Sequence, residues 1–393
     1  MFTGLKVVTL VALMIASLAY GLPVAVKNIA ETPLSDYVVF FTVDRELLLS
    51  EGISNPASMC AISYDDEILP LWVVPETLEG RSVAVYVRIP YIAPGDHYSL
   101  KLSPGPCVQN PFEVFIFYDD FKVFNTKVWT PLATPLIYNI TVKGGAIAGK
   151  GLYISGTYMA PNQYIQILSQ TFPLPLTVET LVTPLTAYDH DACLDLREHG
   201  TEGAHPAEAR GAYIHAWGWG VSGQTEARMG RFTWYRLAGP SGSSNYYWDM
   251  TTWNDGGPSP VFNANETFLF RIGVGPWTTR YEVWQLRADE GLVKLLTHSV
   301  DLGVENDVVI ALGQGCGGSY NFTQKAVFHW VLVRQFAWPQ PRIAVGAERV
   351  EESPLSSITE FLSKPTNLIL ASWSVIVVVL VIVVISKVKR KSW

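Results

Sequence analysis

The sequence predicts an all-β protein in which two β-sandwich modules precede one C-terminal transmembrane helix. Two observations carry the all-β prediction. A helical period is almost absent between the two ends of the chain, and short runs rich in Val, Ile, Tyr, Phe and Thr recur there instead. Gly, Pro, Asn and Asp separate these runs, which is the pattern of antiparallel sandwiches. A long uncharged run near the C-terminus predicts the membrane helix.

The first 21 residues have the layout of a secretory signal peptide. Lys6 precedes an apolar run over 7–18, and small residues follow as far as Gly21. Cleavage is expected between Ala19 and Pro23, and a retained anchor is the alternative. The chain is exported on either interpretation.

The other end predicts a membrane anchor. Residues 347–366 are polar and aperiodic and predict a stalk, residues 367–386 are long enough to cross a bilayer, and residues 387–393 carry four basic side chains. Because basic residues stay on the inner side, the tail is expected to be cytoplasmic. These features predict a single-pass protein of the cell membrane with an extracellular ectodomain.

Residues 22–110 predict a small module with an immunoglobulin-like sandwich. Six runs have the length and composition of strands, and turn residues separate them. The six are 23–28, 37–44, 58–65, 67–74, 82–90 and 97–103.

Residues 111–346 predict a jelly roll, because they hold more strands than one small sandwich can use. The clearest strands are 164–172, 176–183, 211–220, 231–239, 267–275, 280–288, 308–314 and 326–336.

Four cysteines and three sequons fit an exported chain. The even count favours disulfides, and pairing within each module would join Cys60 to Cys107 and Cys193 to Cys316. The glycosylation candidates are Asn139, Asn265 and Asn321.

The charge of the ectodomain argues against nucleic acid as a partner. The formal net charge is −7, and leaving out Lys6 and the basic tail gives −12 for residues 22–386. Binding of nucleic-acid phosphates needs a basic face, and the acidic net charge of this chain does not indicate one.

Two family resemblances add to this interpretation. Segments 24–44 "VAVKNIAETPLSDYVVFFTVD", 60–74 "CAISYDDEILPLWVV" and 83–105 "VAVYVRIPYIAPGDHYSLKLSPG" resemble the domain-of-unknown-function family 2341 of exported archaeal and bacterial proteins. The second half is similar to the concanavalin A-like, laminin-G-type jelly roll, both in its opening "FIFYDDFKVFNTKVWT" and in its closing "AVFHWVLVRQFAWPQPRIAVG". Together they imply a membrane-anchored surface protein of a prokaryote, an archaeon in particular. The jelly-roll family normally carries Asp before the closing tryptophan, where this chain has His329.

The adjacent Asp119 and Asp120 are the most conspicuous carboxylates. Neighbours in a strand point to opposite faces, so they make a poor glycosidase pair, which needs a separation of roughly 5 to 9 Å. A structural corner at the start of the jelly roll is the better interpretation. No alternating acid run or other catalytic motif occurs, and Glu179 and Glu282 each stand among apolar neighbours. The sequence therefore predicts no catalytic residues and no enzyme.

The segment 188–208 gathers aspartates and histidines. It is either a solvated polar loop or a metal site. Calcium favours carboxylate oxygens, so Asp189 and Asp191 are the first candidate ligands, whereas the histidines would favour zinc.

Aromatic residues are dense over 213–284. Alternation favours core positions for Trp217, Trp219 and Trp234. The segment 245–257 is polar enough to be a loop, and loops on rigid sandwiches carry most binding functions. The candidate ligand contacts there are Tyr246, Tyr247, Trp248, Asp249, Trp253, Asn254 and Asp255.

The function predicted from these features is adhesion or recognition at the cell surface, without catalysis. The partners would be glycans or cell-envelope proteins, since sugars stack on aromatic rings. A structural envelope component and a jelly-roll polysaccharide hydrolase are the alternatives.

Overall fold

The computed structural model describes residues 21–133, 137–144, 150–160, 163–186, 190–200, 211–218, 229–233, 263–300, 304, 306–316 and 322–347. One compact unit ends at Glu348, and a second covers Arg349–Trp393. The predicted signal peptide up to residue 20, the stalk from 348 onward, the transmembrane helix and the tail lie outside the described residues. Within the described residues, no helix has both the length and the apolar character that a membrane crossing needs.

The N-terminal module is a sandwich of two sheets. One layer has the order β22-β1-β7-β3-β4, and β2, β6 and β5 form the other. This second layer is continuous with a sheet of the large module through one parallel pairing, Ser82 of β6 with Gly291 of β19. Buried residues of both layers, Val24, Val39 and Val85 among them, form one core. The strands that arise from this half of the chain are β1 (Leu22–Lys27), β2 (Leu34–Asp44), β3 (Cys60–Ser63), β4 (Ile68–Leu69), β5 (Leu71–Val73), β6 (Ser82–Ile92) and β7 (His97–Ser103). All six strands predicted for this module are confirmed.

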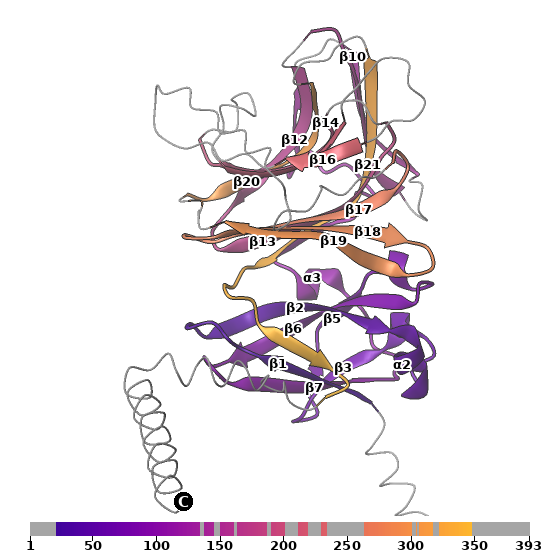
Figure 1. Ribbon diagram of the computed structural model, residues 1–393, viewed down its shortest axis with the longest axis vertical. Helices are drawn as coiled ribbons and strands as arrows, with labels where there is room; N and C mark the ends of the chain where they lie inside the picture. Colours follow the sequence, from indigo (N-terminus) through magenta and orange to yellow (C-terminus); the bar gives the residue numbers. More distant parts are fainter. Residues whose placement is uncertain are drawn as a thin grey trace, which may run out of the picture. The chain divides into compact units, whose positions relative to one another are not determined.

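The last strand of this sheet comes from the far end of the ectodomain. β22 (Arg342–Val345) pairs antiparallel with β1, and its Ala344 lies opposite Ala25. Figure 1 shows it as the yellow strand within the indigo and purple module. The prediction that the jelly roll extends to residue 346 therefore differs from the structure, in which the chain returns to complete the N-terminal sandwich.

The large module, β8 to β21, is a second and bigger sandwich. One layer runs β10-β11-β21-β13-β17-β18-β19, with β8 beside β21, and the other runs β16-β15-β14-β20-β12-β9. The strands are β8 (Phe117–Asp119), β9 (Thr130–Ala133), β10 (Ile137–Gly144), β11 (Lys150–Tyr158), β12 (Gln163–Phe172), β13 (Leu176–Pro184), β14 (His190–Glu198), β15 (Gly211–Gly218), β16 (Met229–Thr233), β17 (Thr267–Val274), β18 (Thr279–Arg287), β19 (Gly291–Val300), β20 (Val308–Cys316) and β21 (Phe322–Gln335).

Alternation along these strands separates an apolar face from an outer face. In β14, Ala192, Leu194 and Leu196 enter the core between the two sheets. The intervening Asp195 and Arg197 therefore lie on the face turned away from that core. The all-β prediction and the two sandwiches are confirmed, whereas β10, β11, β14 and β19 are strands that were not predicted.

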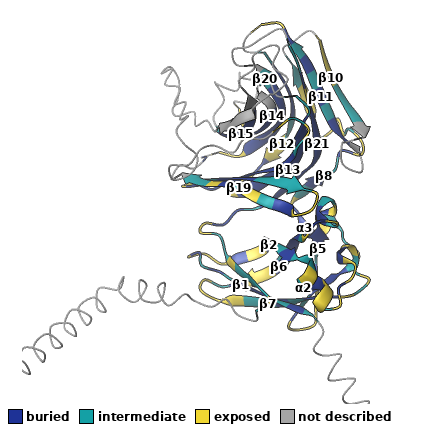
Figure 2. Ribbon diagram, turned by 45° about the vertical axis from the view of Figure 1, so that its right-hand side comes forward, coloured by how far each residue is buried: buried dark blue, intermediate teal, exposed yellow. Residues whose placement is uncertain are grey.

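A third apolar cluster joins the two modules. It contains Trp72 and Tyr86 from the N-terminal module and Leu181, Leu269 and Trp330 from the large module. Leu181, Leu269 and Trp330 belong to β13, β17 and β21, whose residues are largely buried (Figure 2). We call this contact the seam.

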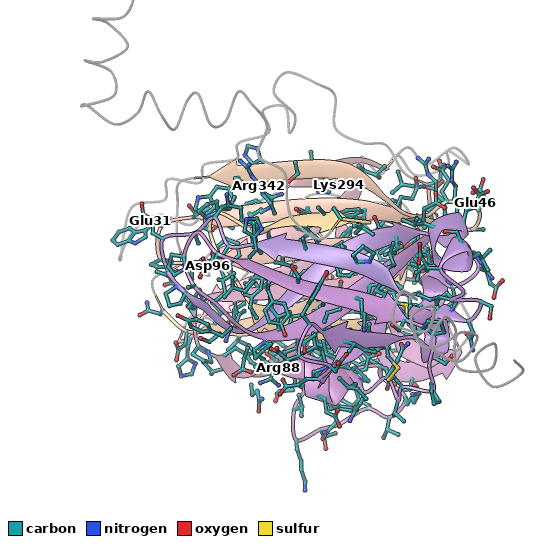
Figure 3. The ribbon with its side chains drawn as sticks, turned by 90° about the horizontal axis from the view of Figure 1, so that it is seen from below. Glu31, Glu46, Arg88, Asp96, Lys294 and Arg342 are labelled. Carbon is teal, nitrogen blue, oxygen red and sulfur yellow. A yellow bond between two sulfur atoms is a disulfide. The ribbon has the colours of Figure 1, made fainter. Side chains whose placement is uncertain are left out.

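Two short helices occur among the described residues, α2 (Arg45–Ser50) and α3 (Pro111–Val114). The Asp44 carboxylate caps α2 by accepting the N–H of Glu46 at 2.8 Å. Glu46 is labelled in Figure 3 at the side of the N-terminal module. Neither helix contributes a long apolar face, which agrees with the near absence of a helical period in the sequence.

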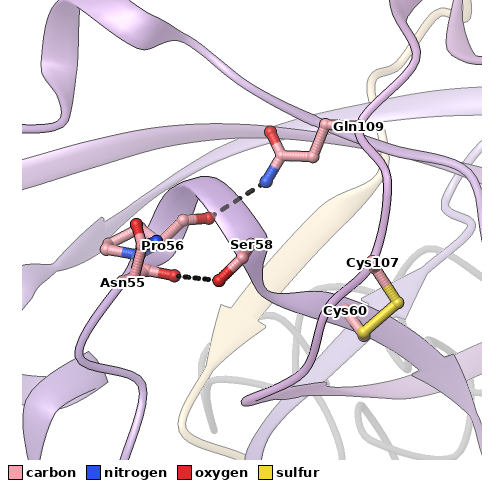
Figure 4. The surroundings of a disulfide bond; sticks show 6 residues. All are labelled: Asn55, Pro56, Ser58, Cys60, Cys107 and Gln109. Carbon is pink, nitrogen blue, oxygen red and sulfur yellow. Dashed lines mark hydrogen bonds between the residues drawn. A yellow bond between two sulfur atoms is a disulfide. The ribbon is translucent and has the colours of Figure 1, made fainter.

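One of the two predicted disulfides is confirmed. Cys60 and Cys107 are bonded, with Cα atoms 5.2 Å apart (Figure 4). Gln109, just beyond Cys107, donates to the Pro56 carbonyl at 3.0 Å, so the segment that enters the large module is fixed to the N-terminal module twice. Cys193 is buried in β14, and the side chain of Cys316 lies outside the described residues. Their pairing stays a prediction.

Candidate functional site

Most residues predicted to bind a ligand lie outside the described residues. This holds for the whole aromatic segment: Tyr246, Tyr247, Trp248, Asp249, Trp253, Asn254 and Asp255. It also holds for Asp189 and for the side chain of Asp191, whose backbone is the second residue of β14. Among the described residues, no group of acidic, His or Cys side chains could hold a metal ion. The calcium site stays a prediction.

Two of the three sequons are described. Asn139 is exposed on β10, and Asn265 is exposed in the turn before β17, where its φ of 70° is left-handed. Both side chains are accessible to a glycosyltransferase, as surface glycosylation requires. Asn321 lies outside the described residues.

The interpretation of 188–208 as a solvated loop is wrong for its first half. Residues His190–Glu198 form β14, a strand inside the six-stranded sheet, paired with β15 and β20. Asp195 and Arg197 are fully buried. The sequence does contain a strand pattern here, because Ala192, Leu194 and Leu196 occupy alternate positions. The many charged residues in the same segment favoured a loop prediction instead.

These buried charges belong to a polar cluster on the outer face of that sheet, formed by Gln166, Asp195, Arg197 and His215. His215 Nε2 lies 2.8 Å from Asp195 Oδ1. Asp195 Oδ2 accepts from Gln166 Nε2 at 2.8 Å and from Arg197 Nη2 at 3.0 Å. Arg197 also donates to the side-chain oxygen of Gln166. Strands β12, β14 and β15 thus hold one carboxylate in a fixed set of donors.

The electrostatics of the cluster keep Asp195 ionised. Burial alone would raise the pKa of this carboxyl, but the charges and hydrogen bonds of His215 and Arg197 outweigh burial and hold the pKa below its usual value. The Tyr213 ring lies beside His215, with centroids 5.8 Å apart. The cluster therefore combines an anion, a guanidinium, an amide and a ring in a rigid arrangement.

The described side chains of this face do not include the pair of carboxyl groups that a glycosidase uses. Such an enzyme needs two carboxyl groups flanking a sugar, one of them with a raised pKa so that it can donate a proton. Asp195 is the only carboxylate among the described side chains of this face, and its pKa is lowered.

The two isolated glutamates, Glu179 and Glu282, also have lowered pKa values. Burial opposes this in both, but nearby arginine charges, Arg271 foremost, outweigh it. Neither glutamate is suited to donate a proton as a catalytic acid.

The carboxylates that open the large module form a corner, as predicted. Asp119 Oδ1 accepts the N–H of Phe121 at 2.8 Å, and Oδ2 accepts the indole N–H of Trp129 at 2.8 Å. Asp120 accepts the N–H of Lys122 at 3.2 Å. Burial raises the pKa of Asp119, and its hydrogen bonds only partly offset this. Trp129 is fully buried, so the opening motif anchors an aromatic core residue through a carboxylate.

His329, which stands where the resembling family has Asp, serves the interior. Its Nε2 lies 2.8 Å from Thr183 Oγ1, which in turn lies 2.8 Å from Thr267 Oγ1. Burial lowers the pKa of His329 to about 4, so the ring is neutral at pH 7. A buried neutral imidazole that is bonded to one threonine hydroxyl indicates a packing role.

No protein-family model matches the sequence, and no curated protein matches it. The resemblance to family 2341 therefore stays a prediction.

Solved structures do match parts of the chain. A cellulose-induced protein, Cip1, matches with 12% identity over 60% of this chain and 100% of its own, at a TM-score of 0.35. A β-glucanase of Bacillus licheniformis matches with 17% identity over 56% and 98%, at 0.31. A legume lectin-like domain from Entamoeba histolytica matches with 10% identity over 54% and 91%, at 0.33. Likeness at these TM-scores decides neither the fold nor the function of this chain.

Proposed function

We propose that this chain is a single-pass cell-surface protein whose large module binds glycans without cleaving them. The observation that carries the proposal is the polar cluster on the outer face of the six-stranded sheet. Its carboxylate, guanidinium and amide are buried and bonded to one another, so the cluster would hold the face that binds a sugar in a fixed shape and would not contact the sugar itself. The signal peptide, the transmembrane helix and the cytoplasmic tail are part of the same proposal and rest on the sequence.

Two features support a ligand site at this sheet. The cluster joins β12, β14 and β15, and the segment 245–257 follows β15 in the chain and is rich in the aromatic residues on which sugars stack. The absence of catalysis is supported by the lowered pKa of Asp195 and by its lack of a second carboxylate among the described side chains of its face. Calcium at Asp189 and Asp191 would complete the site.

The test is a glycan array with the full chain in detergent micelles, with and without a calcium chelator. We expect binding to a subset of glycans. Asp195→Asn keeps the size of the side chain but removes the charge that holds Arg197 and His215, so it should loosen the binding face and weaken binding about tenfold. The matched control is Asp307→Asn, the same change at an exposed aspartate before β20, which should bind like the parent.

Three outcomes would contradict the proposal. If no glycan binds, the module is not a lectin. If Asp195→Asn folds and binds as the parent does, the site lies elsewhere. If reducing ends are released from a bound polysaccharide and Asp195→Asn stops the release, the protein is a hydrolase. Binding that survives chelation would remove calcium from the proposal and leave the rest.

A structural envelope role is the second candidate, favoured by one surface. Val108, Phe112, Ile116 and Val123 are 90%, 71%, 58% and 76% exposed, and all four fall in the short segment that leads into the large module. Several large apolar side chains close together at the surface mark contact sites. If the array is negative, assembly between copies of the chain is the expectation to test.

A further inference from the structure

The seam has a charged half beside its apolar half, and it lies on the sheet opposite the polar cluster. Glu179 on β13 accepts from Arg271 Nη2 at 2.7 Å, from Arg334 Nε at 2.7 Å and from the hydroxyl of Tyr86 at 2.5 Å. Arg271 and Arg334 come from β17 and β21, whereas Tyr86 comes from β6 of the N-terminal module. One buried carboxylate therefore connects both modules.

A second carboxylate extends this network toward the surface. Glu282 on β18 accepts from Arg271 Nη1 at 2.5 Å and from Arg280 Nη2 at 2.7 Å. Lys294 on β19 lies 3.7 Å from the same carboxylate and 4.6 Å from the centre of the Trp284 ring. Its side chain is 39% exposed, and its place on the molecule is labelled in Figure 3.

The charges of this network do not balance. Four cations, Arg271, Arg280, Lys294 and Arg334, surround two carboxylates, so the group carries a net charge of +2. Burial raises the pKa of the hydroxyls of Tyr37 and Tyr86, so neither offers a compensating negative charge. Uncompensated charge in a partly buried place is costly, which favours binding of an anion.

A cavity adjoins the cations. Its volume is about 210 Å³, and it is lined by the cations Arg271, Lys294 and Arg334, by Glu282 and Trp284 of β18, and by residues of β2 and of the segment that leads into β22. Glu282 is already bonded to Arg271 and Arg280, so three cations face one neutralised carboxylate there. Arg271 Nε is buried and has no hydrogen-bond partner within the described part of the chain. Burial and the neighbouring arginines lower the pKa of Lys294, the effect that crowded cations produce.

We infer that this cavity binds a small oxyanion, a carboxylate, sulfate or phosphate group, at the seam between the two modules. Arginine forks and a lysine are the donors that such groups favour, and a metal cation would be repelled by the same charge. Because the cavity is lined from both modules, the bound anion would also hold them together. An inorganic anion and the acid group of a charged sugar share this chemistry.

Isothermal titration calorimetry on the full chain in detergent tests the inference. The titrants are sodium sulfate, sodium phosphate and sodium glucuronate, each at constant ionic strength kept with chloride. We expect saturable binding of at least one of them to one site per chain. A preference for glucuronate would identify an acidic sugar as the source, and a preference for sulfate or phosphate would identify an inorganic or ester anion.

Lys294→Gln should weaken this binding about tenfold, since it removes one charged donor. Lys122→Gln is the control, because Lys122 is 77% exposed in the segment 121–129, which does not line the cavity. Lys294→Met, which removes the same charge with a side chain of similar length, gives a second variant if the first does not fold. Absence of saturable binding by all three anions would overturn the inference, and so would equal binding by Lys294→Gln and Lys122→Gln. Neither result depends on the glycan array, so the two proposals can fail separately.

Discussion

At the residue scale, single carboxylates are used where several donors would otherwise be buried without a partner. Asp119 is the clearest case, since its two oxygens receive the backbone of Phe121 and the indole of the fully buried Trp129. The neighbouring Asp120 contacts Lys122, whose side chain is mostly exposed. The two aspartates that open the large module therefore differ in role, and Asp119 is the one that holds the corner together by hydrogen bonds.

Asp119→Ala should lower the free energy of unfolding by about 1 to 3 kcal/mol, because it leaves the indole N–H of Trp129 without an acceptor. Asp120→Ala, the matched control, should stay within about 1 kcal/mol, as exposed ion pairs do. Denaturant titration followed by tryptophan fluorescence measures both. Equal losses in the two variants would show that the indole contact does not determine stability at this corner.

At the scale of elements, pairing partners far apart in sequence define the modules. β22 completes the sheet of β1 although more than 300 residues separate them, and β14 places charged residues on the outer face of the six-stranded sheet. The partly buried Ile343 packs against the N-terminal core, whereas its neighbour Arg342 is exposed. This strand is thus held by an apolar contact as well as by its ladder.

Ile343→Asn should cost about 1 to 3 kcal/mol of stability, because a polar amide replaces a side chain packed on the N-terminal core. Arg342→Asn introduces the same residue one position earlier, at an exposed side chain, and should leave the stability nearly unchanged. Thermal unfolding of the two variants side by side gives the comparison. If Ile343→Asn left the free energy of unfolding unchanged, β22 would be held only by its backbone hydrogen bonds.

At the scale of the whole ectodomain, the seam makes two sandwiches depend on each other. Its apolar cluster takes side chains from both, and Glu179 is shared by Arg271, Arg334 and Tyr86. Removing one member of a buried ion network is expensive, because the others stay buried without compensation.

Glu179→Ala should therefore lower the free energy of unfolding by about 3 to 5 kcal/mol. Glu290→Ala removes a half-exposed ion pair with Arg287 and should cost less than about 1 kcal/mol. Calorimetric unfolding of the full chain in detergent distinguishes them. Similar small losses in both variants would show that the seam carries little of the stability.

The sequence by itself determined the all-β class, most strands of both sandwiches, the Cys60–Cys107 disulfide and the structural role of Asp119. These follow from local alternation, turn residues and spacing, which are properties of short segments. Only the tertiary structure decided that β22 belongs to the first sandwich, that Asp195 meets Gln166, Arg197 and His215, and that Glu179 and Glu282 are held by arginines at the seam. Each of these contacts joins residues from different strands, and no local pattern specifies which strands become neighbours. In particular, a charged residue in an apolar strand shows its role only once its partners across the sheet are known.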